Sequence, residues 1–360
     1  MTLIHPQRRW LRLALMLFVM LSGPVYAGTC NFRPAQPSAL RPVVPLAGSI
    51  TIGRDLPVGS EIYRRAFTTT SDFTIACSAG NYVYYRQFNG APPYPLSSYV
   101  HPTYGARVYT TAVAGIGAAI LTGGAAMPVS NNMALPSGQG TVDLYAGSQY
   151  TLVLFKISDA VGSGTITGAQ IPSIRYRMQG DNTLDLLLGS FTGQLNIVSR
   201  TCTTPDVAVN LGTHQMSALN GIGTGTGWMN VPVRLTNCPA FYARSLTGSY
   251  NDRGQANQTA TANAIRYRVN AVTSVINPTQ GVMALQPDGT NQTATGIGIQ
   301  MADAGGNPIT YGSNRPSGLA LTTTNNGNYT INLRARYYQT GATPTSGQAN
   351  GAATVTLIYE

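Results

Sequence analysis

The stretch A-T-V-T-L-I-Y-E (353–360) alternates apolar and polar side chains, which is typical of a β-strand. Ala353, Val355, Leu357 and Tyr359 fall on one face of that strand. The stretch has no proline and a single charge, so its edge should adhere to other strands, and natural proteins usually protect such edges. We therefore expect residues 353–360 to form a strand that another β segment covers.

Runs of the same kind recur along the chain, separated by Gly, Asn, Pro and Ser. Examples are D-F-T-I-A-C (72–77), Y-T-L-V-L-F-K-I (150–157), M-N-V-P-V-R-L-T-N-C (229–238) and Y-T-I-N-L-R-A-R-Y (329–337). This spacing predicts an all-β chain made of β-sandwiches, and 360 residues are enough for two. The stretches A-G-I-G-A-A-I (114–120) and T-G-I-G-I-Q-M (295–301) share a Gly-Ile-Gly strand start, a weak sign that the two sandwiches are related. We place the domains at 28–199 and 200–360.

Residues 1–27 have the pattern of a secretory signal peptide. Three arginines precede an apolar run (13–21) that is too short to span a bilayer, and small residues lie just before Gly28. The pair Arg8–Arg9 also allows twin-arginine export, although the rest of that pattern is poor. We expect an exported mature chain that begins near Gly28.

Charged residues are only 9% of the chain, against about 25% in typical soluble proteins. The formal net charge is +10, and it falls to +7 without the three arginines of residues 1–27. The remaining cations are scattered arginines, with Lys156 the only lysine, so no basic stripe suggests nucleic-acid binding. Weak attraction to anionic glycans or matrix stays open.

Four cysteines in an exported chain indicate disulfides. Three pairings are possible, and we favour Cys30–Cys77 with Cys202–Cys238 because each half then has its own cross-link. Zinc is the weaker alternative, since no C-x-x-C occurs and the mature chain has only His101 and His214. We predict no metal and no cofactor.

Four stretches of the second half form a specific pattern. They are C-T-T-P-D-V-A-V-N-L-G (202–212), V-P-V-R-L-T-N-C (231–238), T-G-I-G-I-Q-M-A-D-A-G-G-N-P-I-T-Y-G (295–312), and Y-T-I-N-L-R-A-R-Y-Y-Q-T (329–340) with the residues that follow it. They resemble the pilin domain of chaperone–usher fimbriae, and the first looks like that domain's first strand. The resemblance implies an incomplete immunoglobulin-like sandwich that lacks its seventh strand.

In that family a periplasmic chaperone supplies the missing strand, and the N-terminal extension of the adjacent fimbrial subunit later replaces it. The resemblance implies these two partners and the outer-membrane usher. It also implies that Val355, Leu357 and Tyr359 face the chaperone or the donated strand.

The first half resembles, more loosely, the receptor-binding domains of type 1 and type 3 fimbrial adhesins. The likeness rests on F-T-I-A-C (73–77), on residues 108–120 and on L-V-L-F-K-I-S-D-A-V-G-S-G-T-I-T-G (152–168). A pilin domain preceded by another domain can receive a strand but has no free extension to donate, which implies the fibre tip. We expect an extracellular tip adhesin, exported through the periplasm, that attaches bacteria to a host glycan or extracellular-matrix protein. The alternative is a non-adhesive capping or initiating tip subunit.

Residues 81–109 are rich in tyrosine, which offers flat apolar area and a hydroxyl at low entropic cost. We interpret Tyr82, Tyr84 and Tyr109 as half-buried strand residues. The candidate receptor contacts from this segment are Arg86, Tyr94, Tyr99, His101, Tyr104 and Arg107.

A second candidate site is the predicted turn R-M-Q-G-D-N-T (177–183). Gln179, Asp181 and Asn182 could hydrogen-bond sugar hydroxyls, and they fall about where mannose-binding tip adhesins carry polar pocket residues. Gly-Asp-Asn is also an ordinary turn sequence. Those adhesins place an aromatic N-terminal residue in the pocket, whereas this chain should begin with Gly28, which disfavours mannose.

The sequence gives little support to catalysis. It contains no H-E-x-x-H and no G-x-S-x-G, and the mature chain has two histidines. We predict that the protein is not an enzyme and that it has no catalytic residues.

Overall fold

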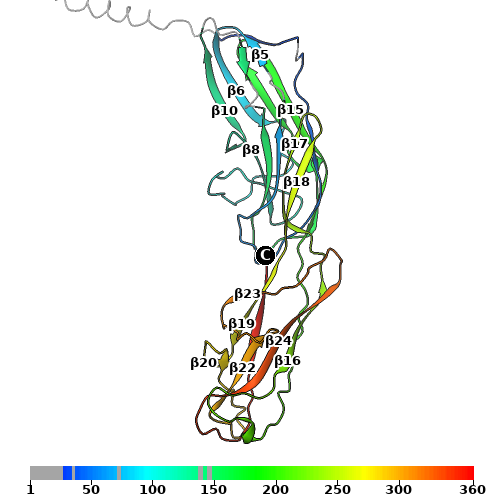
Figure 1. Cartoon of the computed structure of the whole chain (residues 1–360). Coiled ribbons are helices and arrows are strands. Elements are labelled where there is room, and N and C mark those ends of the chain that lie inside the picture. Colours follow the sequence, from blue (N-terminus) through cyan, green and yellow to red (C-terminus); the bar gives the residue numbers. More distant parts are fainter. Residues whose placement is uncertain (1–26, 35–36, 71–73, 137–140, 144–147) are drawn as a thin grey trace, which may run out of the picture.

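Strands make up nearly all of the regular structure, as the alternating runs predict. The computed structural model describes residues 27–34, 37–70, 74–136, 141–143 and 148–360, so the predicted signal peptide lies outside the described residues apart from Ala27. Figure 1 shows two β-rich halves arranged end to end, with the C-terminus between them. Across the described ranges, no helix is long and apolar enough to cross a membrane.

The first half contains a small sheet and a large one. The small sheet has the order β1 (Cys30–Phe32), β5 (Thr74–Cys77), β11 (Thr141–Asp143). The path through the large sheet is β10 (Val129–Leu135), β6 (Gly80–Phe88), β14 (Ile174–Gln179), β15 (Thr183–Val198), β3 (Ser49–Thr51), β17 (Ala243–Asn251), β4 (Glu61–Thr68), β12 (Tyr150–Lys156), β8 (Ile116–Thr122), β7 (Tyr109–Thr110). Four further strands join it from the side: β2 (Val43–Leu46), β9 (Ala125–Ala126), β13 (Gly164–Thr167) and β18 (Ala256–Ala262).

The long strand β15 joins the two parts of this large sheet, β10–β6–β14 on one side and the strands from β3 to β7 on the other. Its first half pairs with β14 and its second half with β13 and β3, so one strand spans the whole length of the first core. That core is mostly aliphatic and also contains large buried aromatic side chains, among them Tyr63, Phe67, Tyr150 and Tyr176. Burial of such rings supplies much of the apolar area that stabilises a β-sandwich.

The second half forms two opposed sheets. One has the order β16 (Met229–Cys238), β24 (Gly327–Gln339), β22 (Ile297–Asp303), β21 (Val282–Met283), β20 (Val275–Asn277), and the other is β23 (Asn314–Pro316), β19 (Ile265–Ala271), β25 (Ala353–Tyr359). Two short 3₁₀ helices, η1 (Gly168–Gln170) and η2 (Met216–Ala218), complete the described elements. Residues 353–359 are therefore a strand, as their alternation predicts.

Both disulfides follow the predicted pairing. Cys30 joins Cys77 across the β1–β5 ladder, and Cys202 joins Cys238 at the end of β16. The shared Gly-Ile-Gly motif also has one structural role in both halves, because Gly115 and Gly296 have φ of 78° and 68° immediately before β8 and β22. Such positive φ values favour glycine at a strand entrance.

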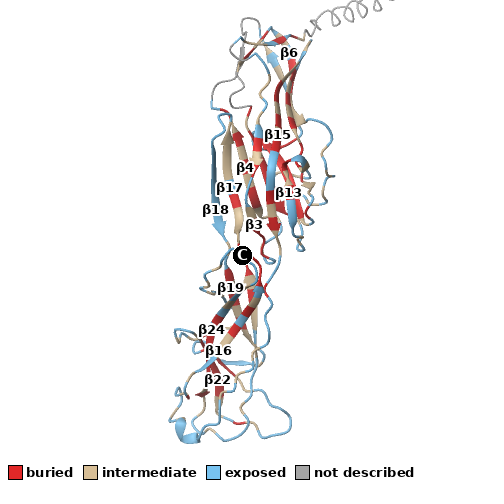
Figure 2. Cartoon of the chain, turned by 90° about the vertical axis from the view of Figure 1, so that its right-hand side faces the viewer, coloured by how far each residue is buried: buried red, intermediate tan, exposed pale blue. Residues whose placement is uncertain are grey.

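The hairpin β17–β18 belongs to the second half by sequence and to the first half by strand pairing. β17 pairs parallel to β4, from Leu246↔Tyr63 to Asn251↔Thr68, and Ala243 pairs with Ile50 of β3. β18 pairs with β17 and forms an outer edge of the sheet, where Figure 2 shows it in pale blue. The boundary at residue 200 remains a prediction, and this β-ladder crosses it.

A buried lysine organises the junction between the halves. Lys156 is fully buried, and its Nζ donates hydrogen bonds of 2.6 Å to the carbonyl oxygens of both Arg54 and Leu56. Burial lowers the pKa of Lys156. Asp55, held between these two carbonyls, accepts a hydrogen bond of 3.1 Å from the backbone N–H of Tyr359. The lysine therefore fixes the loop against which β25 ends.

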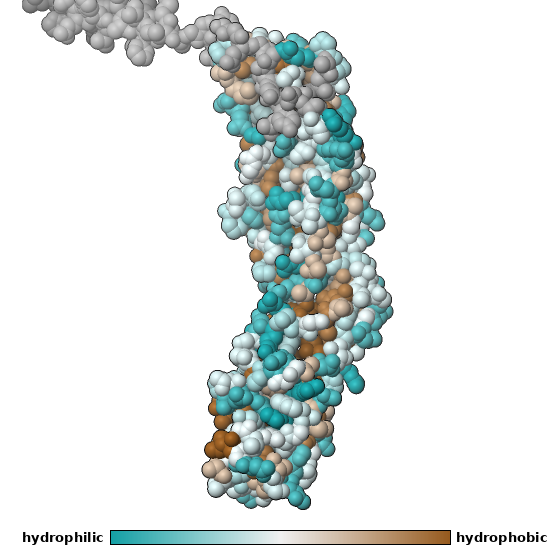
Figure 3. All heavy atoms as spheres, viewed as in Figure 1, coloured by the Kyte–Doolittle hydropathy of each residue, from teal (hydrophilic) through white to brown (hydrophobic). Residues whose placement is uncertain are grey.

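The surface is mostly polar and neutral, with few apolar patches. Figure 3 shows one at the lower left, where Figure 1 places β20. Exposed apolar residues around β20 are Val272, Val275 and Ile276.

Candidate functional site

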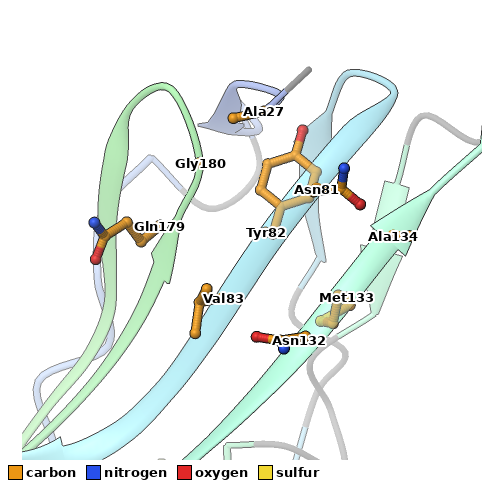
Figure 4. Close-up of a pocket in the computed structure, with 9 residues that line it drawn as sticks. All are labelled: Ala27, Asn81, Tyr82, Val83, Asn132, Met133, Ala134, Gln179 and Gly180. Carbon is orange, nitrogen blue, oxygen red and sulfur yellow. The ribbon is translucent and has the colours of Figure 1, made fainter. Parts of the chain in front are cut away.

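A shallow pocket of about 490 Å³ lies at the end of the first half that is farthest from the second half (Figures 1 and 4). We call it the distal pocket. Its lining comes from β6, β10, the end of β14 and the start of the described chain, and comprises Ala27, Asn81, Tyr82, Val83, Asn132, Met133, Ala134, Gln179 and Gly180.

Strand register brings the polar side chains of this pocket together. Val83 of β6 lies opposite Asn132 of β10 on one side and opposite Gln179 of β14 on the other. Directly opposed residues of antiparallel strands point to the same face, so the two amides flank Val83. Both amide side chains are exposed. Asn132, Val83 and Gln179 therefore present two carboxamides with a small apolar side chain between them.

The wall of the distal pocket is held by Tyr82. Its hydroxyl donates to the carbonyl oxygen of Ser78 at 2.8 Å, next to Cys77, and it also lies 3.3 Å from the carbonyl oxygen of Thr29. The ring is 3% exposed and fills space that glycines leave open, since a Cβ on Gly180 would lie 2.8 Å from it. The disulfide Cys30–Cys77 and Tyr82 thus fix the pocket to the rigid end of the sheet.

The chemistry of the distal pocket is neutral and amide-rich. Among the residues that the structure describes, the lining contains no Asp, Glu, Lys, Arg or His. Carboxamides both donate and accept hydrogen bonds, and the apolar parts of Val83 and Met133 offer dispersion contacts. This combination suits an uncharged ligand with many hydroxyl or amide groups better than it suits an ion.

The same sheet face continues from the pocket toward Tyr85 and a strong ion pair. Tyr85 lies opposite Arg177, whose Nε is 2.6 Å from Oδ1 of Asp185. The Arg177 guanidinium lowers the pKa of Asp185 by hydrogen bonding and by its charge. This face therefore adds a half-exposed aromatic ring beside the ion pair, with Arg175 on the same face of β14.

The predicted turn 177–183 is divided between two roles. Gln179 lines the distal pocket, and the backbone N–H of Asp181 donates to the carbonyl oxygen of Gly28 at 2.9 Å, while its side chain is exposed. The side chain of Asn182 accepts from the N–H of Cys30 at 2.9 Å and donates to the carbonyl oxygen of Cys30 at 2.6 Å. Asn182 therefore clamps β1, and its amide is occupied by the protein.

The tyrosine-rich loop forms an aromatic cluster elsewhere on the first half, made of Tyr99, His101 and Tyr104 over Phe155 of β12. The His101 ring stacks on Tyr104 at 4.5 Å and lies 4.7 Å from the Phe155 ring, both measured between centroids. Nδ1 of His101 accepts hydrogen bonds from the backbone N–H groups of Thr103 and Tyr104. Burial lowers the pKa of His101, which favours the neutral imidazole that accepts these hydrogen bonds.

The other predicted contacts of this loop have mainly internal partners. Arg86 donates to Oδ1 of Asn131 at 2.5 Å, and Arg107 donates to the carbonyl oxygens of Ala126 and Pro128 at 2.7 and 2.8 Å. Tyr94 is half-exposed. Tyr82 and Tyr84 are strand residues, as expected, but they are buried rather than half-buried, and Tyr109 lies in β7.

A separate groove of about 480 Å³ runs along the edge of β25 that pairs with no other strand of the described residues. We call it the pilin groove. Val355 and Leu357 line it, whereas Tyr359 is buried at the domain junction, where its hydroxyl accepts from the N–H of Cys202 at 3.2 Å. The other apolar lining residues are Val207, Val209, Leu211, Val231, Val233, Met283, Ile299, Met301, Ala335 and Ala353.

Residues 204–212 form the opposite rim of the pilin groove and are not a strand, contrary to the resemblance-based expectation. Only Thr203 makes a β-bridge, to Thr236. Pro205 lacks an N–H, which disfavours a ladder at that point. Val207 and Val209 nevertheless point their apolar side chains toward the same groove as Val355.

Sequence reasoning missed Asn81 and Asn132 as lining residues of the distal pocket. They come from strands about fifty positions apart, and only the β6–β10 register places them together. Within the described part of the chain, no group of three or more His, Cys, Asp or Glu side chains is placed to hold a metal ion.

Two protein-family models match different parts of the chain. Residues 190–360 match the family model "Fimbrial protein", and residues 46–192 match "MrkD-like receptor binding domain". The fimbria adhesin protein of Klebsiella pneumoniae is 24% identical over 87% of this chain and 89% of its own length. The type 1 fimbrial subunit of Salmonella typhimurium is 29% identical over 43% of this chain and 71% of its own.

Two solved structures are also similar. The CupB6 tip adhesin from Pseudomonas aeruginosa covers 92% of this chain and 94% of its own at 15% identity, with a TM-score of 0.35. The receptor binding domain of the plasmid-born adhesin MrkD1P of Klebsiella pneumoniae covers 49% of this chain and 98% of its own at 24% identity, with a TM-score of 0.33.

Proposed function

Because the chain joins a MrkD-like receptor-binding domain to a fimbrial pilin domain, as two-domain adhesins of chaperone–usher fimbriae do, we propose that it is the tip subunit of a fimbria and attaches bacteria to a host surface. It acts by binding and not by catalysis. Its receptor is a host glycan or an extracellular-matrix protein, held at the distal pocket.

The observation that carries this proposal is the position of the distal pocket. It lies at the end of the receptor-binding domain away from the pilin domain, where a surface-bound ligand meets the least obstruction from the fibre (Figure 1). Its neutral amides, with Tyr85 on the adjoining face, match the hydroxyl-rich surface of a neutral glycan or the backbone of an extended protein.

The pilin groove supports an attachment mechanism by strand donation. On the described residues β25 pairs with β19 on one side only, and the other edge borders an apolar groove. An extended segment with alternating apolar side chains would gain main-chain hydrogen bonds from this edge and bury its anchors against Val355 and Leu357. We assign this role first to a periplasmic chaperone, delivered to the outer-membrane usher, and then to the N-terminal strand of the adjacent fimbrial subunit.

A binding screen with the full chain tests the adhesive function. The chain, co-expressed with a fimbrial chaperone, is applied to panels of immobilised glycans and matrix proteins. The double variant Asn132→Ala/Gln179→Ala should bind the identified ligand at least tenfold more weakly, since each lost hydrogen bond is worth about 1 kcal/mol. Thr165→Ala, which removes an exposed side chain on β13, serves as the matched control.

Two outcomes would change the proposal. Loss of binding on Tyr104→Ala but not on the double variant moves the receptor site to the aromatic cluster. Absence of any ligand across both panels favours the alternative, a capping subunit that starts fibre assembly without binding a receptor.

A further inference from the structure

We propose that the hairpin β17–β18 is a mechanical clamp through which the pilin domain transmits tensile load to the receptor-binding domain. The inference rests on contacts that follow the hairpin from its base to its tip. It concerns the chain's response to force, so it is independent of which receptor the distal pocket binds.

The base of the hairpin is anchored by Thr51. Its hydroxyl donates to the carbonyl oxygen of Ala240 at 2.7 Å and accepts from the N–H of Tyr242 at 2.9 Å. Thr51 is 2% exposed, so both hydrogen bonds are shielded from water. Shielded bonds of this kind are costly to leave unmade.

The middle of the hairpin contributes to the first hydrophobic core. Leu246 of β17 is 6% exposed and belongs to the same cluster as Ile50 and Tyr63. A Cβ on Gly48 would lie 2.5 Å from the Leu246 side chain, so the two segments are in close contact. The receptor-binding core is thus completed by a side chain from beyond the pilin domain's second cysteine.

Arg65 of β4 locks this arrangement. The residue is 3% exposed, and its guanidinium donates to the carbonyl oxygen of Asn257 at 3.0 Å and to Oε1 of Gln258 at 3.2 Å, both on β18. It crosses over Gly248, where a Cβ would lie 3.1 Å from the guanidinium. A buried cation that loses its hydrogen-bond acceptors is strongly destabilising, so Arg65 makes detachment of the hairpin costly.

The tip is fastened by Asp252. Its Oδ1 accepts from the N–H of Thr70 at 3.0 Å and from the Thr70 hydroxyl at 2.8 Å. The hairpin therefore contacts the receptor-binding domain at both ends as well as in the middle.

The direction of the strands decides how these contacts respond to pulling. β4, β17 and β18 run lengthwise along the receptor-binding half (Figures 1 and 2). β17 and β4 are parallel, and both strands lead away from the junction. Residues 199–201 also join the two halves, so force that draws the halves apart acts on this segment and on the hairpin together. In the hairpin the force slides β17 along β4, which loads the ladder, Arg65 and Asp252 at the same time.

Single-molecule pulling tests the clamp. One handle is attached through Asp181→Cys, in the turn beside the distal pocket. The other is attached through Ser217→Cys, in η2 of the second half, and both side chains are exposed. Full chains carrying the same groove partner are held at constant force, and the lifetime before the halves separate is measured. The clamp predicts at least a tenfold shorter lifetime for Arg65→Ala.

Matched controls separate the clamp from general destabilisation. Arg64→Ala alters the neighbouring residue, whose guanidinium pairs with Glu61 of the same strand, and should change the lifetime less than twofold. If Arg65→Ala does not fold, Asp252→Ala tests the proposal instead, and we expect its lifetime to be about threefold shorter than that of the parent chain. Arg253→Ala, in the same turn, is its matched control. Lifetimes of Arg65→Ala and Asp252→Ala equal to the parent chain would overturn the proposal.

Discussion

Replacing Gly53 by alanine should loosen the junction between the two domains. Gly53 is buried against the end of β25, and a Cβ there would lie 2.1 Å from the carbonyl oxygen and 2.6 Å from the carbonyl carbon of Tyr359. Both are backbone atoms, so no side-chain rotation relieves the clash. β25 or the loop must move by more than about 1 Å to reach ordinary contact.

Two hydrogen bonds depend on that contact. Movement of Tyr359 breaks its N–H bond to Asp55 and its hydroxyl bond to the buried N–H of Cys202. Each loss costs about 1–2 kcal/mol, and the unfolded-chain effect of Gly→Ala returns about 0.4–1 kcal/mol, so the net loss in the free energy of unfolding is about 1–3.5 kcal/mol.

Urea denaturation of the full chain with its groove partner measures this loss. The matched control is Gly162→Ala, because a Cβ there would lie 3.6 Å from the backbone nitrogen of Ala114, at ordinary contact distance. The urea midpoint of Gly162→Ala should equal or exceed that of the parent chain. Gly53→Ala should have a lower urea midpoint and should bind the groove partner less tightly. Equal midpoints for the two alanine variants would refute the steric account of the junction.

Three further predictions follow from buried or hydrogen-bonded side chains. Burial raises the pKa of Tyr84, Tyr150 and Tyr176, so they stay neutral in the folded chain while tyrosines of the unfolded chain ionise near pH 10. The free energy of unfolding is therefore unaffected below that pH and falls above it by up to about 1.4 kcal/mol per pH unit for each tyrosine. A urea midpoint that stays constant to pH 11 would contradict this. Leu357→Ser should abolish co-purification with the chaperone because it places a hydroxyl in the pilin groove, whereas Ile358→Ser, on the opposite face of β25, should retain it. Asn182→Ala should cost about 1–3 kcal/mol by removing both hydrogen bonds to Cys30, and ligand binding that persists in the refolded variant would exclude a direct receptor contact.

The strands and the disulfides could be predicted because their signals are local. Alternation in 353–359 and 229–238 marks strands, and four cysteines in an exported chain indicate cross-links. The hairpin β17–β18 could not be placed in the same way. Its outer strand A-N-Q-T-A-T-A (256–262) is fully exposed and has no apolar face to indicate a partner, so its position depends on tertiary contacts such as Arg65 with Asn257.

The candidate receptor site was predictable only in part. Gln179 was found because a Gly-Asp-Asn turn is visible in sequence, but Asn81 and Asn132 carry no local signal and are united by register alone. Tyr99 and Tyr104 are partly covered by packing on Phe155, which composition cannot reveal. Composition shows which side-chain types are available for a binding site, and the register of the strands determines which of these side chains lie close together.

The burial of Lys156 has a practical consequence for work on this protein. It is the only lysine among the 360 residues, and its amino group is enclosed and engaged with two carbonyl oxygens. Amine-directed reagents therefore find no accessible lysine on the folded chain, so coupling to a biosensor surface through a lysine requires an introduced one. The same property supplies a probe: acylation of Lys156, located by peptide mapping to distinguish it from the α-amino group, reports opening of the domain junction.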